Sequence, residues 1–186
     1  MLSRRAVIKG VFLTGIGSAM GTAAYGVAYA RHQIGVTQVS LPVSGLPPAL
    51  EGLRIGFMTD VHHSTMVPAE DVKRAVDLLM AERPDLIVLG GDYVSFGDRA
   101  FVEPVAELLA LLHAPHGVFA ILGNHDDERN VTEALTRRGI TVLKDTRTRL
   151  GIREERLELA GVRFWTRRPD EIARVLRGAS DTTLLL

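Results

Sequence analysis

Residues 86–92 have the sequence LIVLGGD, in which four large apolar residues are followed by two glycines and an aspartate. A short apolar run that ends at glycine is typical of a strand buried on both faces of a sheet. Residues 69–82 precede it with apolar side chains at helical spacing, and Pro84 ends that helical pattern. Alternation of a strand with a helix of this length indicates an α/β fold with a mostly parallel sheet.

The same alternation continues on both sides of this stretch. It predicts strands at 53–59, 118–122 and 140–143, and helices at 101–112 and 131–138. After residue 150 the pattern predicts a hairpin around Gly161, a helix over 169–177 and a last strand at 182–186. Residues 36–43 alternate loosely and predict an edge strand.

A polar cluster follows each of the first three predicted strands. The clusters are Thr59-Asp60-Val61-His62, Gly90-Gly91-Asp92 and Gly123-Asn124-His125-Asp126. Ligands of open α/β sheets bind beyond the carboxyl ends of the strands, so we expect the three clusters to face one crevice. The intervals from Asp60 to Asp92 and from Asp92 to Asn124 are both 32 residues, the length of one strand–helix unit.

The residue types in these clusters suit a metal site. Asp, His and Asn are ligands for divalent ions such as Mn, Fe or Zn, and a carboxylate can bridge two ions that clamp a phosphoryl group. Each cluster alone has an ordinary structural explanation. Asp92 could cap a helix, and Asn124-His125-Asp126 could form a turn. The occurrence of all three, in this order after buried strands, favours the metal site.

The succession D-x-H, G-D and G-N-H-D resembles the signature of the calcineurin-like metallophosphoesterase superfamily. The resemblance implies an α/β fold, a metallophosphoesterase β-sandwich flanked by helices, over residues 53–186 and incomplete at the C-terminus. It also implies an enzyme that hydrolyses phosphodiester or pyrophosphate bonds by a metal-bound hydroxide at a dinuclear site. Its cofactors would be two divalent metal ions, with manganese favoured and iron or zinc as alternatives.

The resemblance also implies a role for each residue of the clusters. Asp60 and His62 would bind the first metal ion, Asp92 would bridge both ions, and Asn124 would bind the second. His125 would act on the scissile phosphate as a general acid or charge stabiliser, and Asp126 would orient His125. Outside the clusters, we expect His63 on an exposed loop, with a substrate contact as the alternative, and Trp165 in the core rather than under a substrate.

The chain departs from the superfamily pattern in its histidines. The superfamily supplies three more histidine ligands downstream, whereas none of the six histidines in this chain follows His125. We therefore expect the chain to be a fragment of a longer protein, with one ligand of the first ion and two of the second outside it. The alternative is a truncated, non-catalytic remnant that binds metal or phosphate at most weakly.

The N-terminus predicts export from the cytoplasm. Arg4 and Arg5 precede an uncharged run of 21 residues, 10–30, which ends in Ala28-Tyr29-Ala30. This pattern resembles a twin-arginine signal peptide, and a run of this length can alternatively remain as a membrane anchor. Residues 31–52 would then be a connecting arm. Both interpretations predict contact with the export machinery and a periplasmic or membrane-associated catalytic domain.

Composition narrows the classes of partner. The chain has 22 basic and 22 acidic residues, which does not favour a nucleic-acid partner. It has no Cys, so disulfides and thiolate metal sites are excluded. Together with the signal pattern, the motifs are similar to those of the envelope-associated branch that includes UDP-2,3-diacylglucosamine pyrophosphatases of lipid A synthesis. The resemblance thus implies a small-molecule or lipid-linked phosphoester substrate.

Overall fold

The computed structural model of the protein describes residues 33–43 and 45–186, so the predicted signal or anchor lies outside the described residues. The fold below is that of residues 36–186, which form one compact unit. Within the described ranges, no helix is both long and apolar enough to cross a membrane. The edge strand expected at 36–43 is wrong. Its apolar side chains have no surface to pack on, as Val39 is 71% and Leu41 77% exposed.

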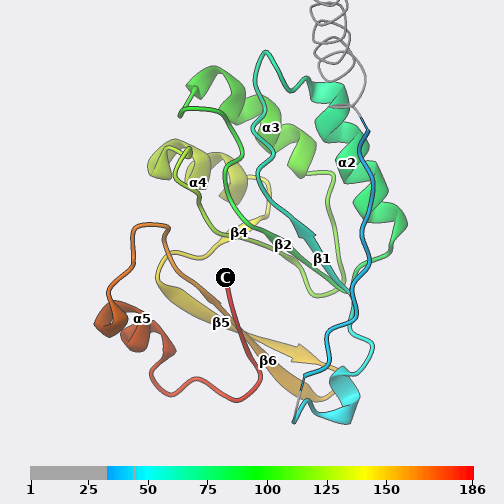
Figure 1. The fold of residues 1–186 in the computed structure, drawn as a ribbon, viewed down its shortest axis with the longest axis vertical. Coiled ribbons are helices and arrows are strands. Elements are labelled where there is room, and N and C mark those ends of the chain that lie inside the picture. Colours follow the sequence, from blue (N-terminus) through cyan, green and yellow to red (C-terminus); the bar gives the residue numbers. More distant parts are fainter. Residues whose placement is uncertain (1–32, 44) are drawn as a thin grey trace, which may run out of the picture. The chain divides into compact units, whose positions relative to one another are not determined.

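Four parallel strands form the first sheet, in the order β1-β2-β3-β4. The strands are β1 (Ile55–Met58), β2 (Leu86–Leu89), β3 (Val118–Ala120) and β4 (Thr141–Val142). The connecting helices are α2 (Ala69–Ala81), α3 (Val102–Leu109) and α4 (Glu128–Thr136), with short 3-10 turns at Pro48–Leu50 and Arg99–Phe101. The three helices lie together on one side of the sheet (Figure 1). The alternation predicted around residues 86–92 is confirmed.

Strand β2 is buried on both faces, which explains its uninterrupted apolar sequence. Ile87 and Leu89 pack in the cluster that includes the inner faces of α2, α3 and α4. Leu86 and Val88 point the other way and pack in a second cluster with residues of the second sheet. Because successive side chains of a strand alternate between the faces, an interior strand between two apolar layers needs a large apolar residue at every position.

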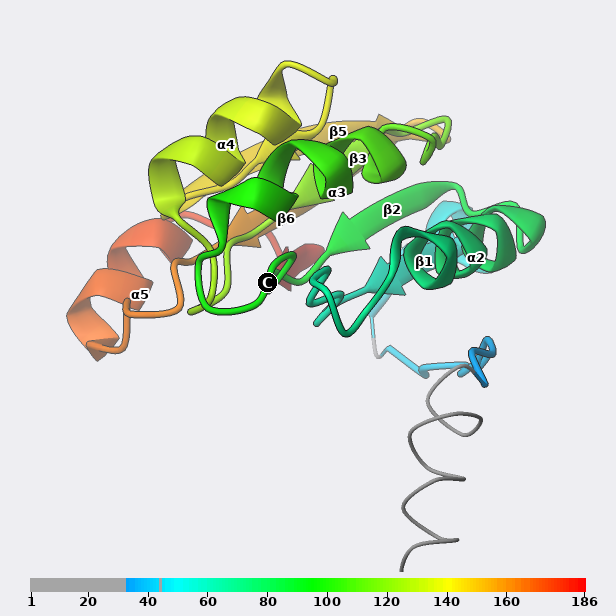
Figure 2. The same cartoon turned by 90° about the horizontal axis from the view of Figure 1, so that it is seen from above.

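The second sheet has three strands in the order β5-β6-β7. They are β5 (Thr146–Ile152), β6 (Glu155–Gly161) and β7 (Thr183–Leu185), and α5 (Pro169–Leu176) joins β6 to β7. Strands β5 and β6 are antiparallel, and β7 runs parallel to β6. Figure 1 and the turned view in Figure 2 show this hairpin on the side of the first sheet that the helices leave free.

The hairpin expected around Gly161 is wrong in position. Its turn consists of Arg153 and Glu154, with φ values of 49° and 73°, the left-handed pair that a tight two-residue hairpin requires. Gly161 instead ends β6 where the second sheet approaches the first. A Cβ on Gly161 would collide with the side chain of Leu143. The glycine therefore marks close packing, not a turn.

The two sheets enclose a common apolar layer. Leu86, Val88 and Phe119 of the first sheet share this cluster with Ile152, Leu157 and Leu159 of the second sheet. The structure is thus a mixed α/β sandwich with flanking helices, as the sequence and the resemblance predicted. Ile55 and Phe57 of β1 are in register with Leu86 and Val88, yet 41% and 60% of their surfaces are exposed. The second sheet therefore does not cover β1.

Candidate metal centre

The loops that follow β1 and β2 bring three potential metal ligands together. One ligand atom each of Asp60, His62 and Asp92 lies within 4.8 Å of the others. The Nε2 atom of His62 is 3.8 Å from Oδ1 of Asp60 and 3.8 Å from Oδ2 of Asp92. Two carboxylates and an imidazole at this spacing form a donor set that suits a divalent cation. The crevice expected at the strand ends is present.

Asn124 and His125 extend this group from the loop after β3. Asn124 lines the same hollow of about 320 Å³ as Asp60 and Asp92. The backbone N–H of His125 donates to Oδ1 of Asp92 at 2.8 Å, and its ring packs edge-on against His62 with 4.8 Å between the centroids. The loops after three neighbouring strands thus converge on one site.

The backbone of the candidate ligands is strained. Asp60, His62 and Asp92 have φ values of 54°, 49° and 56°, in the left-handed region that costs a non-glycine residue roughly 1–2 kcal/mol. Backbone hydrogen bonds between the loops hold this conformation. Asp60 N donates to Gly91 O at 3.0 Å, and His62 N donates to Asp92 O at 2.9 Å. Such strain is common at functional sites, where side chains must point in a defined direction.

Two glycines allow the loops after β2 and β3 to touch. A Cβ on Gly91, whose φ is 94°, would collide with the backbone of Gly123. A Cβ on Gly123 would in turn collide with the carboxylate of Asp92. Only a residue without a side chain fits at either position.

Asp126 binds backbone groups and not the His125 ring. Its carboxylate accepts the N–H groups of Asp92 at 2.8 Å, Tyr93 at 2.9 Å and Gly123 at 2.9 Å. Burial raises the pKa of Asp126, and the N–H donors, Gly123 first among them, partly offset this rise. Asp126, which was expected to orient His125, thus bonds the two loops to each other and not the His125 ring, because both loops have buried N–H groups that need an acceptor.

The partner of the His125 ring is a residue that the sequence did not indicate. The backbone N–H of Phe96 donates to Nδ1 of His125 at 2.9 Å. A neutral imidazole that accepts at Nδ1 carries its proton on Nε2. The sequence held no signal for this contact, because the donor is a backbone group that almost any residue could supply.

Two other expectations fail. His63 is 4% exposed, because its backbone pairs with the loop after β2 and its Nδ1 lies 2.8 Å from Val67 O. It therefore neither lies on an exposed loop nor touches the hollow. Trp165 is 44% exposed instead of lying in the core, and its ring packs against Phe164 and the guanidinium of Arg163.

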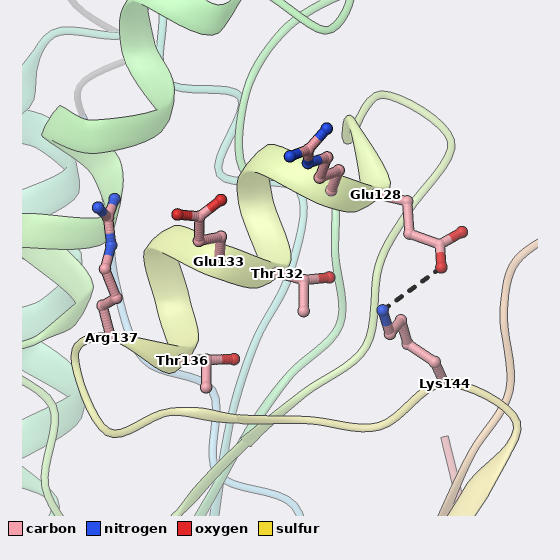
Figure 3. Close-up of a pocket in the computed structure, with 7 residues that line it drawn as sticks. Glu128, Thr132, Glu133, Thr136, Arg137 and Lys144 are labelled. Carbon is pink, nitrogen blue, oxygen red and sulfur yellow. Dashed lines mark ion pairs between the residues drawn. The ribbon is translucent and has the colours of Figure 1, made fainter.

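A second, larger hollow of about 570 Å³ lies along α4 (Figure 3). Glu128, Thr132 and Lys144 are among the residues that line it, and Glu128 pairs with Lys144 at 3.4 Å. Among the described residues, only Asp60, His62 and Asp92 form a group of three or more His, Asp or Glu side chains that could hold an ion. The potential metal ligands at the strand ends therefore favour the smaller hollow as the functional site.

Several curated proteins have sequences related to this chain. The chain is 35% identical over 130 residues to the uncharacterized metallophosphoesterase YkuE of Bacillus subtilis. The aligned region covers 67% of this chain and 45% of YkuE. It is 36% identical over 114 residues to the phosphodiesterase YaeI of Escherichia coli, covering 58% of this chain and 42% of YaeI. It is 38% identical over 77 residues to the UDP-2,3-diacylglucosamine pyrophosphatase LpxG of Chlamydia trachomatis, covering 41% of this chain and 23% of LpxG.

The chain spans less than half the length of each of these relatives. The calcineurin-like phosphoesterase family profile matches residues 53–166, which include every candidate ligand and more than half of the chain. With the α/β sandwich and the ligand cluster at its strand ends, this match shows that the chain belongs to the calcineurin-like phosphoesterase family.

Proposed function

We propose that the protein is a metal-dependent hydrolase that cleaves phosphodiester or pyrophosphate bonds at the strand-end site. The observation that carries the proposal is the group formed by Asp60, His62 and Asp92, whose ligand atoms lie within 4.8 Å of one another. Family membership supports it, because the match includes all three residues. Activity, substrate and partners of the whole protein are inferences, since the relatives are more than twice as long as the matched segments.

The donor set supports the following ligands. Asp60 and His62 would hold one divalent ion, Asp92 would reach both ions, and Asn124 would contribute its amide oxygen to the second. Carboxylate, imidazole and amide donors suit manganese, and iron or zinc accept the same ligands. The bound ions would supply Lewis-acid polarisation of the phosphoryl oxygens and lower the pKa of a coordinated water.

The remaining site residues would orient groups and move a proton. His125, with Nδ1 occupied by the Phe96 N–H, presents Nε2–H as the donor to a phosphoryl or leaving oxygen. Asp126 acts through the backbone, because it joins the segment that carries Asp92 to the segment that carries Asn124. It is therefore a positioning residue.

The names of two relatives support the proposed substrate class. YaeI is named a phosphodiesterase and LpxG a UDP-2,3-diacylglucosamine pyrophosphatase, which supports a diester or pyrophosphate that is small or lipid-linked. The pair Arg4-Arg5 before the uncharged run supports export and a periplasmic or membrane-associated location.

The proposal is tested with the full chain and Mn²⁺. Bound metal is counted after gel filtration, and hydrolysis of bis(p-nitrophenyl) phosphate is followed by release of p-nitrophenolate. We expect manganese-dependent turnover that Asp60→Asn and His62→Gln abolish. The control is Asp77→Asn, which removes an exposed carboxylate paired with Lys73 on α2 and should change neither quantity. One weakly bound ion without turnover would instead support a non-catalytic metal-binding protein.

A further inference from the structure

We propose that Phe96 is a substrate-contacting residue that binds a flat or apolar ester group next to the scissile phosphate. The proposal rests on the function proposed above, because it requires a phosphoryl group at the candidate metal ligands. It adds a position at which the site distinguishes between substrates.

Phe96 extends the metal site outward through a row of rings. The ring of His62 is 4.8 Å from the ring of His125, and the ring of His125 is 5.1 Å from that of Phe96. Phe96 is 91% exposed, the highest value among the exposed large apolar residues of the described chain. A phosphoryl group beside His62 and His125 would therefore direct its organic group toward an uncovered aromatic face.

Phe96 shares an unusual backbone conformation with the candidate ligands. Its φ is 52°, and eight non-glycine residues of the described segments have a positive φ. Four of the eight are Asp60, His62, Asp92 and Phe96, all at this site. A bulky side chain is rare in the left-handed region, so its presence calls for a specific reason.

The hydrogen bond to His125 accounts for the backbone conformation of Phe96. It does not account for the presence of a phenyl side chain at this position. Any residue except proline could supply the N–H, and glycine would do so at this φ without strain. The phenyl ring also adds nothing to the core, because it is almost fully exposed. The ring is therefore the feature that needs an external partner.

Hydrogen bonds on both sides of Phe96 hold its backbone in place. Ser95 Oγ donates to His62 O at 3.3 Å, and Asp98 N donates to Ser95 O at 3.0 Å. The Asp98 carboxylate also accepts the N–H of Ala100 at the start of the 3-10 turn. Because the loop backbone is already ordered, a ligand that stacks on the Phe96 ring does not have to order the loop when it binds, which limits the entropic cost of binding.

The test compares two phosphonates that cannot be hydrolysed, benzylphosphonate and ethylphosphonate, which differ in the group that would reach Phe96. Their dissociation constants are measured by titration calorimetry on the manganese-loaded full chain. An aromatic contact of ordinary strength predicts that benzylphosphonate binds about 2- to 10-fold more tightly. Phe96→Gly suits the local φ and keeps the N–H to His125, so it should remove this preference. Phe96→Trp should retain the preference.

The control is Leu111→Ala, which removes an exposed apolar side chain just after α3 and should leave both constants unchanged. Equal binding of the two phosphonates to the wild type, or a preference that persists in Phe96→Gly, would overturn the role of Phe96 and leave the proposed function standing. If neither phosphonate binds, the proposed function is overturned, and the role of Phe96 with it.

Discussion

The carboxylate of Asp126 accepts the backbone N–H of Asp92 at 2.8 Å, although the two residues are 34 positions apart. The same carboxylate accepts the N–H groups of Tyr93 and Gly123. One side chain thus joins the loop after β2 to the loop after β3, where Asp92 and Asn124 lie. The position of these two candidate ligands depends on a residue that is not expected to touch a metal ion.

Replacement of Asp126 by Asn should loosen this junction. An amide keeps one acceptor oxygen but directs an NH2 group at backbone donors, so at least one buried N–H loses its partner. The free energy of unfolding should fall by about 1–3 kcal/mol, measured by urea denaturation of the metal-free protein. Manganese affinity should fall by roughly 10- to 100-fold, as for other residues that position ligands indirectly. Asp170→Asn, at an exposed ion pair with Arg168, should change neither. An unchanged unfolding midpoint for Asp126→Asn would show that the tie is dispensable.

The glycine after β3 should tolerate no side chain. In Gly123→Ala, the new Cβ would collide with the carboxylate and backbone N of Asp92, so one of the two loops must move. We expect a loss of roughly 3 kcal/mol or more in unfolding free energy, together with loss of metal binding. Gly151→Ala is the matched control, since a Cβ at that strand position meets no atom within 4 Å. Comparable stability of the two variants would contradict the close approach.

The sheet and the site's location could be predicted from the sequence because both depend on local patterns. The run Leu86–Leu89 is buried on both faces, and a continuous apolar run is sufficient to recognise such a strand. The order of strands along the chain then places the loops after β1, β2 and β3 at one edge, so Asp60, His62 and Asp92 could be grouped without coordinates.

The features that the sequence did not predict depend on contacts between distant backbone segments. Gly161 carries the ordinary signal of a turn, and only the approach of Leu143 shows that it serves close packing. The N–H groups that bind Asp126 belong to the backbone, and the pattern of side chains in a sequence does not indicate where a loop's N–H groups point. The Phe96 N–H that fixes the His125 ring was missed for the same reason.

Removal of the charge of Asp92 should separate metal binding from folding. Asp92→Asn keeps an oxygen that can accept the His125 N–H, and it relieves repulsion between two carboxylates close enough to share an ion. The metal-free variant should therefore be as stable as the wild type or up to about 1 kcal/mol more stable. Manganese at 100 times the dissociation constant should stabilise the wild type by about 2.7 kcal/mol and the variant by almost nothing. Thermal unfolding with and without Mn²⁺ measures both effects. An equal manganese-induced shift in the two proteins would exclude Asp92 as a ligand.

The second sheet should contribute a pH-dependent term to stability through Glu158. This residue is 3% exposed, and its carboxylate accepts hydrogen bonds from Arg149 at 2.7 Å and Arg147 at 2.9 Å. The hydrogen bond from Arg149, followed by contributions from Ser180 and Arg147, holds the pKa of Glu158 below its usual value of 4.5.

Because the unfolded chain binds the Glu158 proton more readily than the folded chain, the stabilisation is present above pH 4.5 and is lost as the pH falls toward the folded pKa. Glu158→Gln should therefore be less stable than the wild type at about pH 7, and the difference should shrink as the pH falls below about 4.5. Urea denaturation across this range measures it. Glu155→Gln, on the exposed part of β6, serves as the control and should follow the wild-type curve. A difference between wild type and Glu158→Gln that stays constant down to about pH 3 would mean that the two arginines stabilise the folded side chain without favouring its charged form.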